Sequence, residues 1–224
     1  MTERNPDAAQ PAARPDAPAT ARYLPAREPA SIADAAGWLR RGLPVVFPTD
    51  TVYGVGVLPF DAAAVERLYS AKGRPAEKGI PILLADTSDL LQVARDVPPA
   101  AEALMAAFWP GPLTLIVPRR PELPDNLSPD DTVAVRIPDH PVARALIRAA
   151  GGAVATTSAN RSSEPPARSG MDALAALGAY VAAVLDDGPS PGGLASTIIN
   201  CTVEPLAILR AGPLSADDLG LGAR

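Results

Sequence analysis

The sequence predicts an α/β domain built on a twisted, mixed sheet with flanking helices. Short apolar runs typical of buried strands alternate along the chain with segments of helical periodicity, which is the pattern of this class. The 224 residues suit one domain that buries a core of its own, and we find neither an internal repeat nor a second domain. No run of about 18 apolar residues occurs, so we expect no membrane span.

The elements follow from periodicity and from capping residues. We expect helices over residues 32–41, 62–73, 88–95, 100–108 and 141–150. We expect strands over residues 44–47, 80–85, 113–117, 132–137, 153–157, 181–185, 197–201 and 206–209. Ser31 and Asp61 are candidate N-caps for the first two helices, and Gly42 and Gly73 are candidate stop signals.

The two ends of the chain differ in composition from its middle. Residues 1–27 are rich in Ala and Pro and nearly free of large apolar side chains, so burial cannot offset their ordering entropy. We expect a disordered tail over 1–27, without the apolar core of a signal peptide, then a catalytic domain over 28–215 and a short tail over 216–224.

Charge and cysteine usage exclude several classes of protein. The net charge of −5 and the pI of about 4.9 argue against a general nucleic-acid surface, so any site for a polyanion must be local. One cysteine, Cys201, excludes an internal disulfide and fits a reducing cytoplasm. With a single histidine, His140, the common zinc arrangements are also excluded, and we expect no protein-held metal.

Two polar segments follow predicted elements in the first half of the chain. Residues 48–56, Pro-Thr-Asp-Thr-Val-Tyr-Gly-Val-Gly, lie at the end of a buried strand, where open α/β sheets bind ligands; a polar turn is the alternative. Lys72, Arg74 and Lys78 follow a helix and could clamp phosphate or merely cap the helix. These three residues include both lysines of the chain, which has eighteen arginines. The ammonium of lysine and the guanidinium of arginine are not equivalent cations.

Two further segments carry hydroxyl groups and cations in the second half. Residues 156–160, Thr-Thr-Ser-Ala-Asn, end a strand and could cradle phosphate or ribose oxygens, or form a cap and an Asx turn. Arg210 ends an apolar strand, where it either meets an anion or reaches water. No Walker loop, dinucleotide fingerprint or nucleophile–histidine pair is present, and aromatic residues are too few for a base-stacking surface.

In this order the motifs closely resemble the YrdC-like domain of threonylcarbamoyl-AMP synthases over about residues 31–212. The matching segments are 48–54, 72–75, 109–114, 132–138, 158–160, 196–199 and 208–212. The resemblance implies a large concave groove and the joining of L-threonine, bicarbonate and ATP into threonylcarbamoyl-adenylate and pyrophosphate. It implies threonine contacts at Thr51, Arg136, Thr156 and Ser196, ATP contacts at Arg74, Lys78, Thr132, Ser158, Arg168 and Arg210, and a catalytic pair in Lys72 and Arg74.

The same resemblance implies Mg²⁺ bound mostly through the nucleotide, separate transferase proteins that modify tRNA, and contact with tRNA or double-stranded RNA. The chain departs from the family at Leu83, at residues 161–163 and at Asn200. It ends where longer relatives continue, as expected of a short, single-domain form. The alternatives are a double-stranded RNA-binding module and a carbamoyl-transfer domain of hydrogenase maturation.

Overall fold

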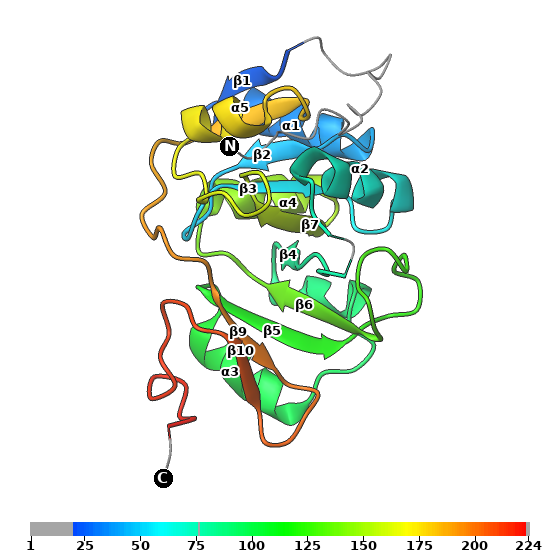
Figure 1. Cartoon of the computed structure of the whole chain (residues 1–224), viewed down its shortest axis with the longest axis vertical. Helices are drawn as coiled ribbons and strands as arrows, with labels where there is room; N and C mark the ends of the chain where they lie inside the picture. The colour runs from blue at the N-terminus through cyan, green and yellow to red at the C-terminus, as the bar shows by residue number, and fades with distance from the viewer. Residues whose placement is uncertain (1–19, 76, 223–224) are drawn as a thin grey trace, which may run out of the picture.

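One mixed sheet of ten strands runs through the part of the chain that the computed structural model describes, residues 20–75 and 77–222 (Figure 1). The strands are β1 (Arg22–Pro25), β2 (Val45–Phe47), β3 (Gly54–Val57), β4 (Ile82–Leu84), β5 (Leu113–Pro118), β6 (Thr132–Arg136), β7 (Ala153–Ser158), β8 (Ala183–Asp186), β9 (Thr197–Asn200) and β10 (Ala207–Arg210). Their order across the sheet is β1-β8-β2-β3-β7-β4-β6-β5-β9-β10. Strand β2 pairs parallel with β8 and antiparallel with β3, so the sheet is mixed, as predicted.

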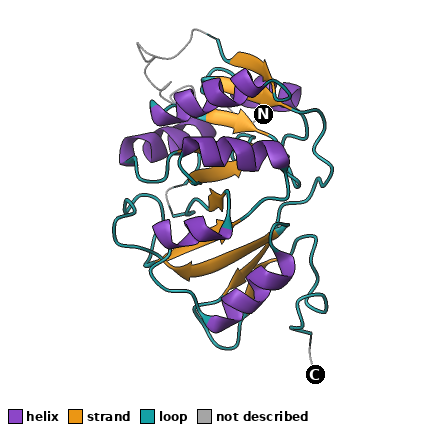
Figure 2. Ribbon diagram, turned by 180° about the vertical axis from the view of Figure 1, so that it is seen from behind, coloured by secondary structure: helices purple, strands orange, loops and turns teal. Residues whose placement is uncertain are grey.

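Helices cover both faces of the sheet (Figure 2). They are α1 (Pro29–Arg40), α2 (Ala62–Lys72), the 3₁₀ helix η1 (Thr87–Gln92), α3 (Pro99–Phe108), α4 (Pro141–Ala150) and α5 (Gly170–Leu177). The predicted cap of α2 is confirmed, because the Asp61 side chain accepts from the backbone N–H of Ala64, and Gly73 ends the helix in the left-handed region at φ 59°. Ser31 is not a cap: α1 begins at Pro29, and Ser31 lies buried inside the helix.

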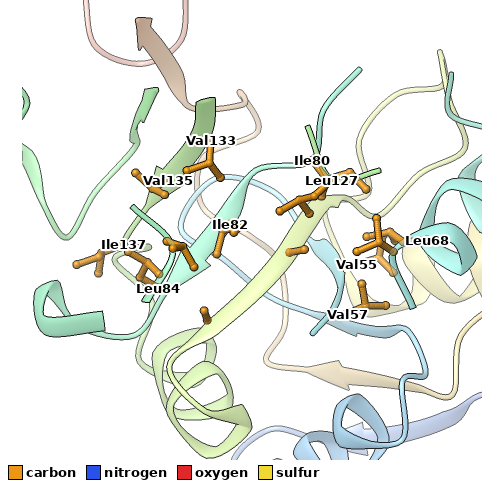
Figure 3. Packing of buried hydrophobic residues seen from close by; sticks show 14 of the residues in the cluster. Val55, Val57, Leu68, Ile80, Ile82, Leu84, Leu127, Val133, Val135 and Ile137 are labelled. Atoms are coloured by element: carbon orange, nitrogen blue, oxygen red, sulfur yellow. The ribbon is translucent and has the colours of Figure 1, made fainter. Parts of the chain in front are cut away.

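Two hydrophobic cores lie on opposite faces of the sheet, because side chains alternate along each strand. In β2, Val46 belongs to the larger core with α2, α3 and α5, while Val45 and Phe47 belong to the smaller core with α1 and α4. Figure 3 shows part of the larger core, where Val55, Ile82 and Val135 come from three strands.

The face that carries the smaller core is only partly covered by helices. Helices α1 and α4 contact β8, β2, β7 and β4 on this face. Among the described residues, the smaller core holds none from β6, β5 or β9. Positions in β6 and β5 that point away from the larger core therefore belong to neither hydrophobic core, and the buried polar residues Arg136 and Thr114 occupy such positions.

Several predicted boundaries are corrected by the structure. Strand β1 pairs parallel with β8 and buries Leu24, so residues 22–25 are not part of a disordered tail. Residues 1–19 lie outside the described residues. In the segment assigned to the short C-terminal tail, Leu219 packs against the larger core. Elsewhere, the predicted helix 88–95 is the shorter η1, and β3 and α5 were not predicted. No helix among the described residues is long and apolar enough to cross a membrane.

Candidate functional site

A cavity of about 160 Å³ opens on the partly uncovered face of the sheet. Its walls come from the ends of several strands and from the loops that follow them. The lining residues are Thr49, Thr51, Val52, Tyr53, Gly54, Arg74, Pro81, Leu83, Thr114, Arg136, Thr156, Thr157, Ser158, Pro166, Ala195, Ser196 and Arg210. Segments far apart in the sequence thus converge on one hollow, as the strand-end motifs predicted.

The turn after β2 supplies one wall and is held by its own hydroxyl groups. Thr49 Oγ1 donates to Val52 O at 2.6 Å and accepts from the backbone N–H of Thr51 at 3.2 Å. The hydroxyl oxygens of Thr49 and Thr51 lie 3.0 Å apart. Both threonines are buried, so this network fixes the Thr51 hydroxyl at the cavity wall.

Arg136, the last residue of β6, forms a fixed cation at the base of the cavity with only 5% of its surface exposed. Its Nε donates to Gly111 O at 2.9 Å and its Nη1 to Thr51 Oγ1 at 3.0 Å, while Nη2 forms an ion pair with Asp50. Burial lowers the pKa of Arg136 and the charge of Asp50 opposes that shift. A guanidinium keeps its proton in proteins, so the group stays charged.

Two more arginines line the cavity and are held by backbone carbonyls. Arg74 follows α2, and its Nε and Nη2 donate to Lys78 O at 2.9 Å and Gly79 O at 2.8 Å. Arg210 ends β10, and its Nε and Nη2 donate to Ser196 O at 2.9 Å and Ser196 Oγ at 3.0 Å. Because part of each guanidinium is engaged by the protein, its remaining N–H groups keep a defined direction.

Hydroxyl groups fill the space between these cations. Ser196 Oγ lies 2.7 Å from Thr114 Oγ1 across the β5–β9 pair, and both residues are buried. Thr156 stands beside Gly54, where an added Cβ would come within 2.7 Å of the Thr156 methyl carbon. Glycine at this position therefore makes room for the Thr156 side chain at the cavity wall.

The charge of the lining is opposite to that of the whole chain. The lining holds three arginines and no acidic residue, whereas the chain carries a net charge of −5. Burial, followed by the charges of Arg136 and Arg74, lowers the pKa of Arg210, which places Arg210 within the field of the other two cations. Only Asp50, paired with Arg136, offsets them directly within the described residues. The arrangement suits anionic ligands such as carboxylate and phosphate groups.

Most of the predicted site residues are brought together. The cavity is lined by Thr51, Arg74, Arg136, Thr156, Ser158, Ser196 and Arg210. Three other predicted ATP contacts lie outside the lining and stay predictions: Lys78 and Arg168 are exposed, and Thr132 donates its hydroxyl to Asp130.

Lys72, the other residue of the predicted catalytic pair, lies away from the cavity, and its catalytic role stays a prediction. It is 2% exposed and does not line the cavity, and its Nζ donates to the backbone carbonyls of Ser158 and Asn160. The reason is that Lys72 is the last residue of α2 and points to the end of β7, whereas Arg74, beyond the turn at Gly73, reaches the cavity.

Sequence reasoning missed two site residues. Asp50 was seen only as part of a polar segment, and its ion pair spans 86 positions to Arg136. Thr114 was placed in a strand without a role, although a hydroxyl inside an otherwise apolar strand is a signal for a polar partner on one face. The non-local pairing of β5 with β9 supplies that partner, Ser196.

Comparison with known proteins places this geometry in a family. The model of the Sua5/YciO/YrdC family, described as "Telomere recombination", matches residues 38–212, which include every residue of the cavity lining. The chain belongs to the Sua5/YciO/YrdC family. The fold described above is therefore that of a family member, as the sequence motifs predicted.

Individual relatives agree with this assignment. A Bacillus subtilis protein named threonylcarbamoyl-AMP synthase is 40% identical over 84% of this chain and 55% of its own length. A Mycobacterium tuberculosis protein named putative threonylcarbamoyl-AMP synthase is 40% identical over 86% of this chain and 89% of its own. The structure of Pyrococcus abyssi Sua5 complexed with L-threonine superposes with a TM-score of 0.85 at 38% identity, covering 88% of this chain and 59% of that one. The chain thus spans little more than half the length of some relatives.

Proposed function

We propose that this family member is a nucleotidyltransferase that forms L-threonylcarbamoyladenylate and pyrophosphate from L-threonine, bicarbonate and ATP. The observation that carries the proposal is the cavity with three arginines and no acidic lining residue in an acidic chain. The reaction brings together a carboxylate, a carbonate-derived anion and a triphosphate, and such a site suits all three. The names of the relatives and the threonine complex of the Pyrococcus protein support this choice among anionic substrates.

The reaction proceeds without a covalent bond to the protein. The threonine amine attacks bicarbonate, which gives a carbamate and releases water. A carbamate oxygen then attacks the α-phosphorus of ATP, the bond from that phosphorus to the β-phosphate oxygen breaks, and pyrophosphate leaves with the electron pair. Because the carbamate is already an anion, this second step needs no side-chain base, and positioning together with charge stabilisation supplies the catalysis.

Each group of side chains has a role in this scheme. Arg136 and the Thr51 hydroxyl are held in place by the hydrogen bond between them and bind the threonine carboxylate. Thr156 and Ser196 contact the rest of the amino acid. Arg74 and Arg210 neutralise the charge that moves onto pyrophosphate, while Ser158 contacts the nucleotide.

We expect Mg²⁺ to enter with ATP, since it prefers phosphate oxygens and water to an all-protein site. Asp50 is the acidic group next to the cavity and is already paired with Arg136, which fits binding through the nucleotide. The ion supplies charge neutralisation on the phosphates.

We also propose that the product passes to a separate transferase protein that modifies tRNA in the cytoplasm. The site described above is suited to making an adenylate, and the acidity of the chain favours this role over that of an RNA-binding module.

The test is pyrophosphate release with threonine, bicarbonate and ATP omitted in turn. We expect release only when all three are present. Arg210→Met should lower the rate about 30- to 1000-fold, as expected for the loss of one charge-stabilising donor. Arg95→Met, which removes an exposed charge away from the lining, should behave as the wild-type protein. Equal release without threonine would contradict the proposal.

A further inference from the structure

Lys72 is a buried cation that the mechanism above does not use. Only 2% of its surface is exposed, and within the described residues it forms no ion pair. Its ammonium instead donates to two backbone carbonyls, Ser158 O and, at 2.7 Å, Asn160 O. Burying a charge without a carboxylate is unfavourable, so its retention calls for a compensating role.

The two carbonyls belong to the turn that ends β7 at the cavity. The backbone N–H of Ser162 donates to Lys72 O at 2.9 Å, which adds a main-chain contact between α2 and the same turn. Asn160 Nδ2 closes the turn by donating to the carbonyls of Arg161 and Glu164 at 2.8 and 2.6 Å. The end of α2 is thus hydrogen-bonded to the turn after β7.

This connection joins two walls of the cavity. Ser158, whose carbonyl accepts from Lys72, lines the cavity, and so does Arg74, two residues beyond Lys72. A change in the Lys72 contacts therefore changes the spacing between Ser158 and Arg74. A compact ammonium with three N–H groups suits this enclosed position, whereas a planar guanidinium is larger and differently shaped.

We propose that Lys72 is a positioning residue that holds the turn of residues 158–160 against the end of α2, sets Ser158 relative to Arg74, and touches no substrate. The inference deepens the proposed function and rests on it, because Ser158 and Arg74 are the nucleotide-binding groups of that proposal. It replaces the phosphate-clamp role that the sequence suggested for Lys72.

The first test is a double-mutant cycle in turnover. Lys72→Met should lower kcat about 10- to 100-fold, because misplacing reacting groups by about 1 Å costs up to ~100-fold. Lys72→Met combined with Ser158→Ala should be no slower than the slower single variant, since the hydroxyl of a misplaced Ser158 contributes nothing further. Multiplicative losses would show that Lys72 acts independently of the turn and would overturn the proposal.

Arg40→Met is the matched control for this cycle. Arg40 also donates to a backbone carbonyl, Ala149 O at 2.7 Å, but it lies exposed on α1 and does not line the cavity. We expect its kcat to equal that of the wild-type protein.

The second test is the pH profile of kcat. Burial, and then the charge of Arg74, lowers the pKa of Lys72 to about 8; the groups that face it from β7 and its turn are uncharged carbonyls. We expect kcat to decline above pH 8 in the wild-type protein and this decline to be absent in Lys72→Arg, whose charge persists. If the pH profile of kcat is the same in Lys72→Arg as in the wild-type protein, the charge of Lys72 does not affect turnover. That result would contradict the proposal.

The third test needs no reaction and separates the two proposals. In ligand-free Lys72→Met, the amides of residues 158–162 should exchange with solvent faster than in the wild-type protein and Arg40→Met, while those of β2 should not. If Lys72→Met does not fold, Lys72→Arg provides the same comparison. Unchanged exchange would overturn the positioning role, whereas absence of pyrophosphate release from the wild-type protein would overturn the proposed function alone.

Discussion

Replacing Asp50 by Asn should destabilise the protein strongly, because it removes the carboxylate that neutralises a buried arginine. The ion-paired side chains are 13% exposed in Asp50 and 6% in Arg136, so solvent screens the pair weakly. Breaking a buried pair from one side costs about 3–5 kcal/mol. We take about 3 kcal/mol here, at the lower end of that range, since the introduced asparagine keeps one oxygen that can accept from Arg136.

Urea unfolding measures this loss. With a slope of about 1–3 kcal/mol per M, a loss of about 3 kcal/mol lowers the midpoint by about 1–3 M. The double variant Asp50→Asn/Arg136→Met should recover part of the loss, because no unpaired charge is then left in the cavity.

Glu122→Gln provides the control. It breaks the exposed Arg120–Glu122 pair at 2.8 Å, which has a similar separation but lies in solvent, and should leave the midpoint unchanged. If Asp50→Asn unfolds at the same urea concentration as Glu122→Gln, the argument that Arg136 depends on Asp50 is refuted.

Three other predictions concern β1, Cys201 and Gly212. Deleting residues 1–27 should lower the melting temperature relative to deleting 1–19, because it removes β1 and the buried Leu24; equal melting temperatures would show that β1 adds no stability. Cys201 should resist iodoacetamide at about pH 8 until urea is added, because burial raises the pKa of its thiol to about 11; rapid labelling of the native protein would contradict this. Gly212→Ala should raise the KM for threonine, since its Cβ would lie 2.4 Å from Thr197 N and 2.6 Å from Ser196 C, whereas Gly37→Ala, with no atom within 4 Å, should not.

Much of the fold could be predicted because most elements carry strong local signals. The cap at Asp61 and the left-handed stop at Gly73 bound α2 as expected, and apolar runs located most strands. Strand β3 was missed because Gly54 and Gly56 resemble a loop, yet here they permit close packing against Val154 and Thr156. Strand β1 was missed because its partner β8 lies far along the chain, beyond the reach of local patterns.

Several residues of the site could be predicted from the sequence, but the contacts between them could not. The polar segment after a buried strand pointed to the stretch that contains Thr51, whereas Arg136 and Ser196 came from the resemblance to the family. The sequence could not show that Lys72 turns away from the cavity, since this depends on the angle between α2 and β7. Residues two positions apart around a helix end, such as Lys72 and Arg74, point in different directions.

The central claim is tested most directly by mass spectrometry of the product formed with ¹³C-bicarbonate. The account predicts threonylcarbamoyl-adenylate one mass unit heavier than with ordinary bicarbonate, and none with Arg136→Met or without threonine. Melting curves should first show that Arg136→Met is folded. Formation of AMP and pyrophosphate with no ¹³C-labelled adenylate would contradict the account.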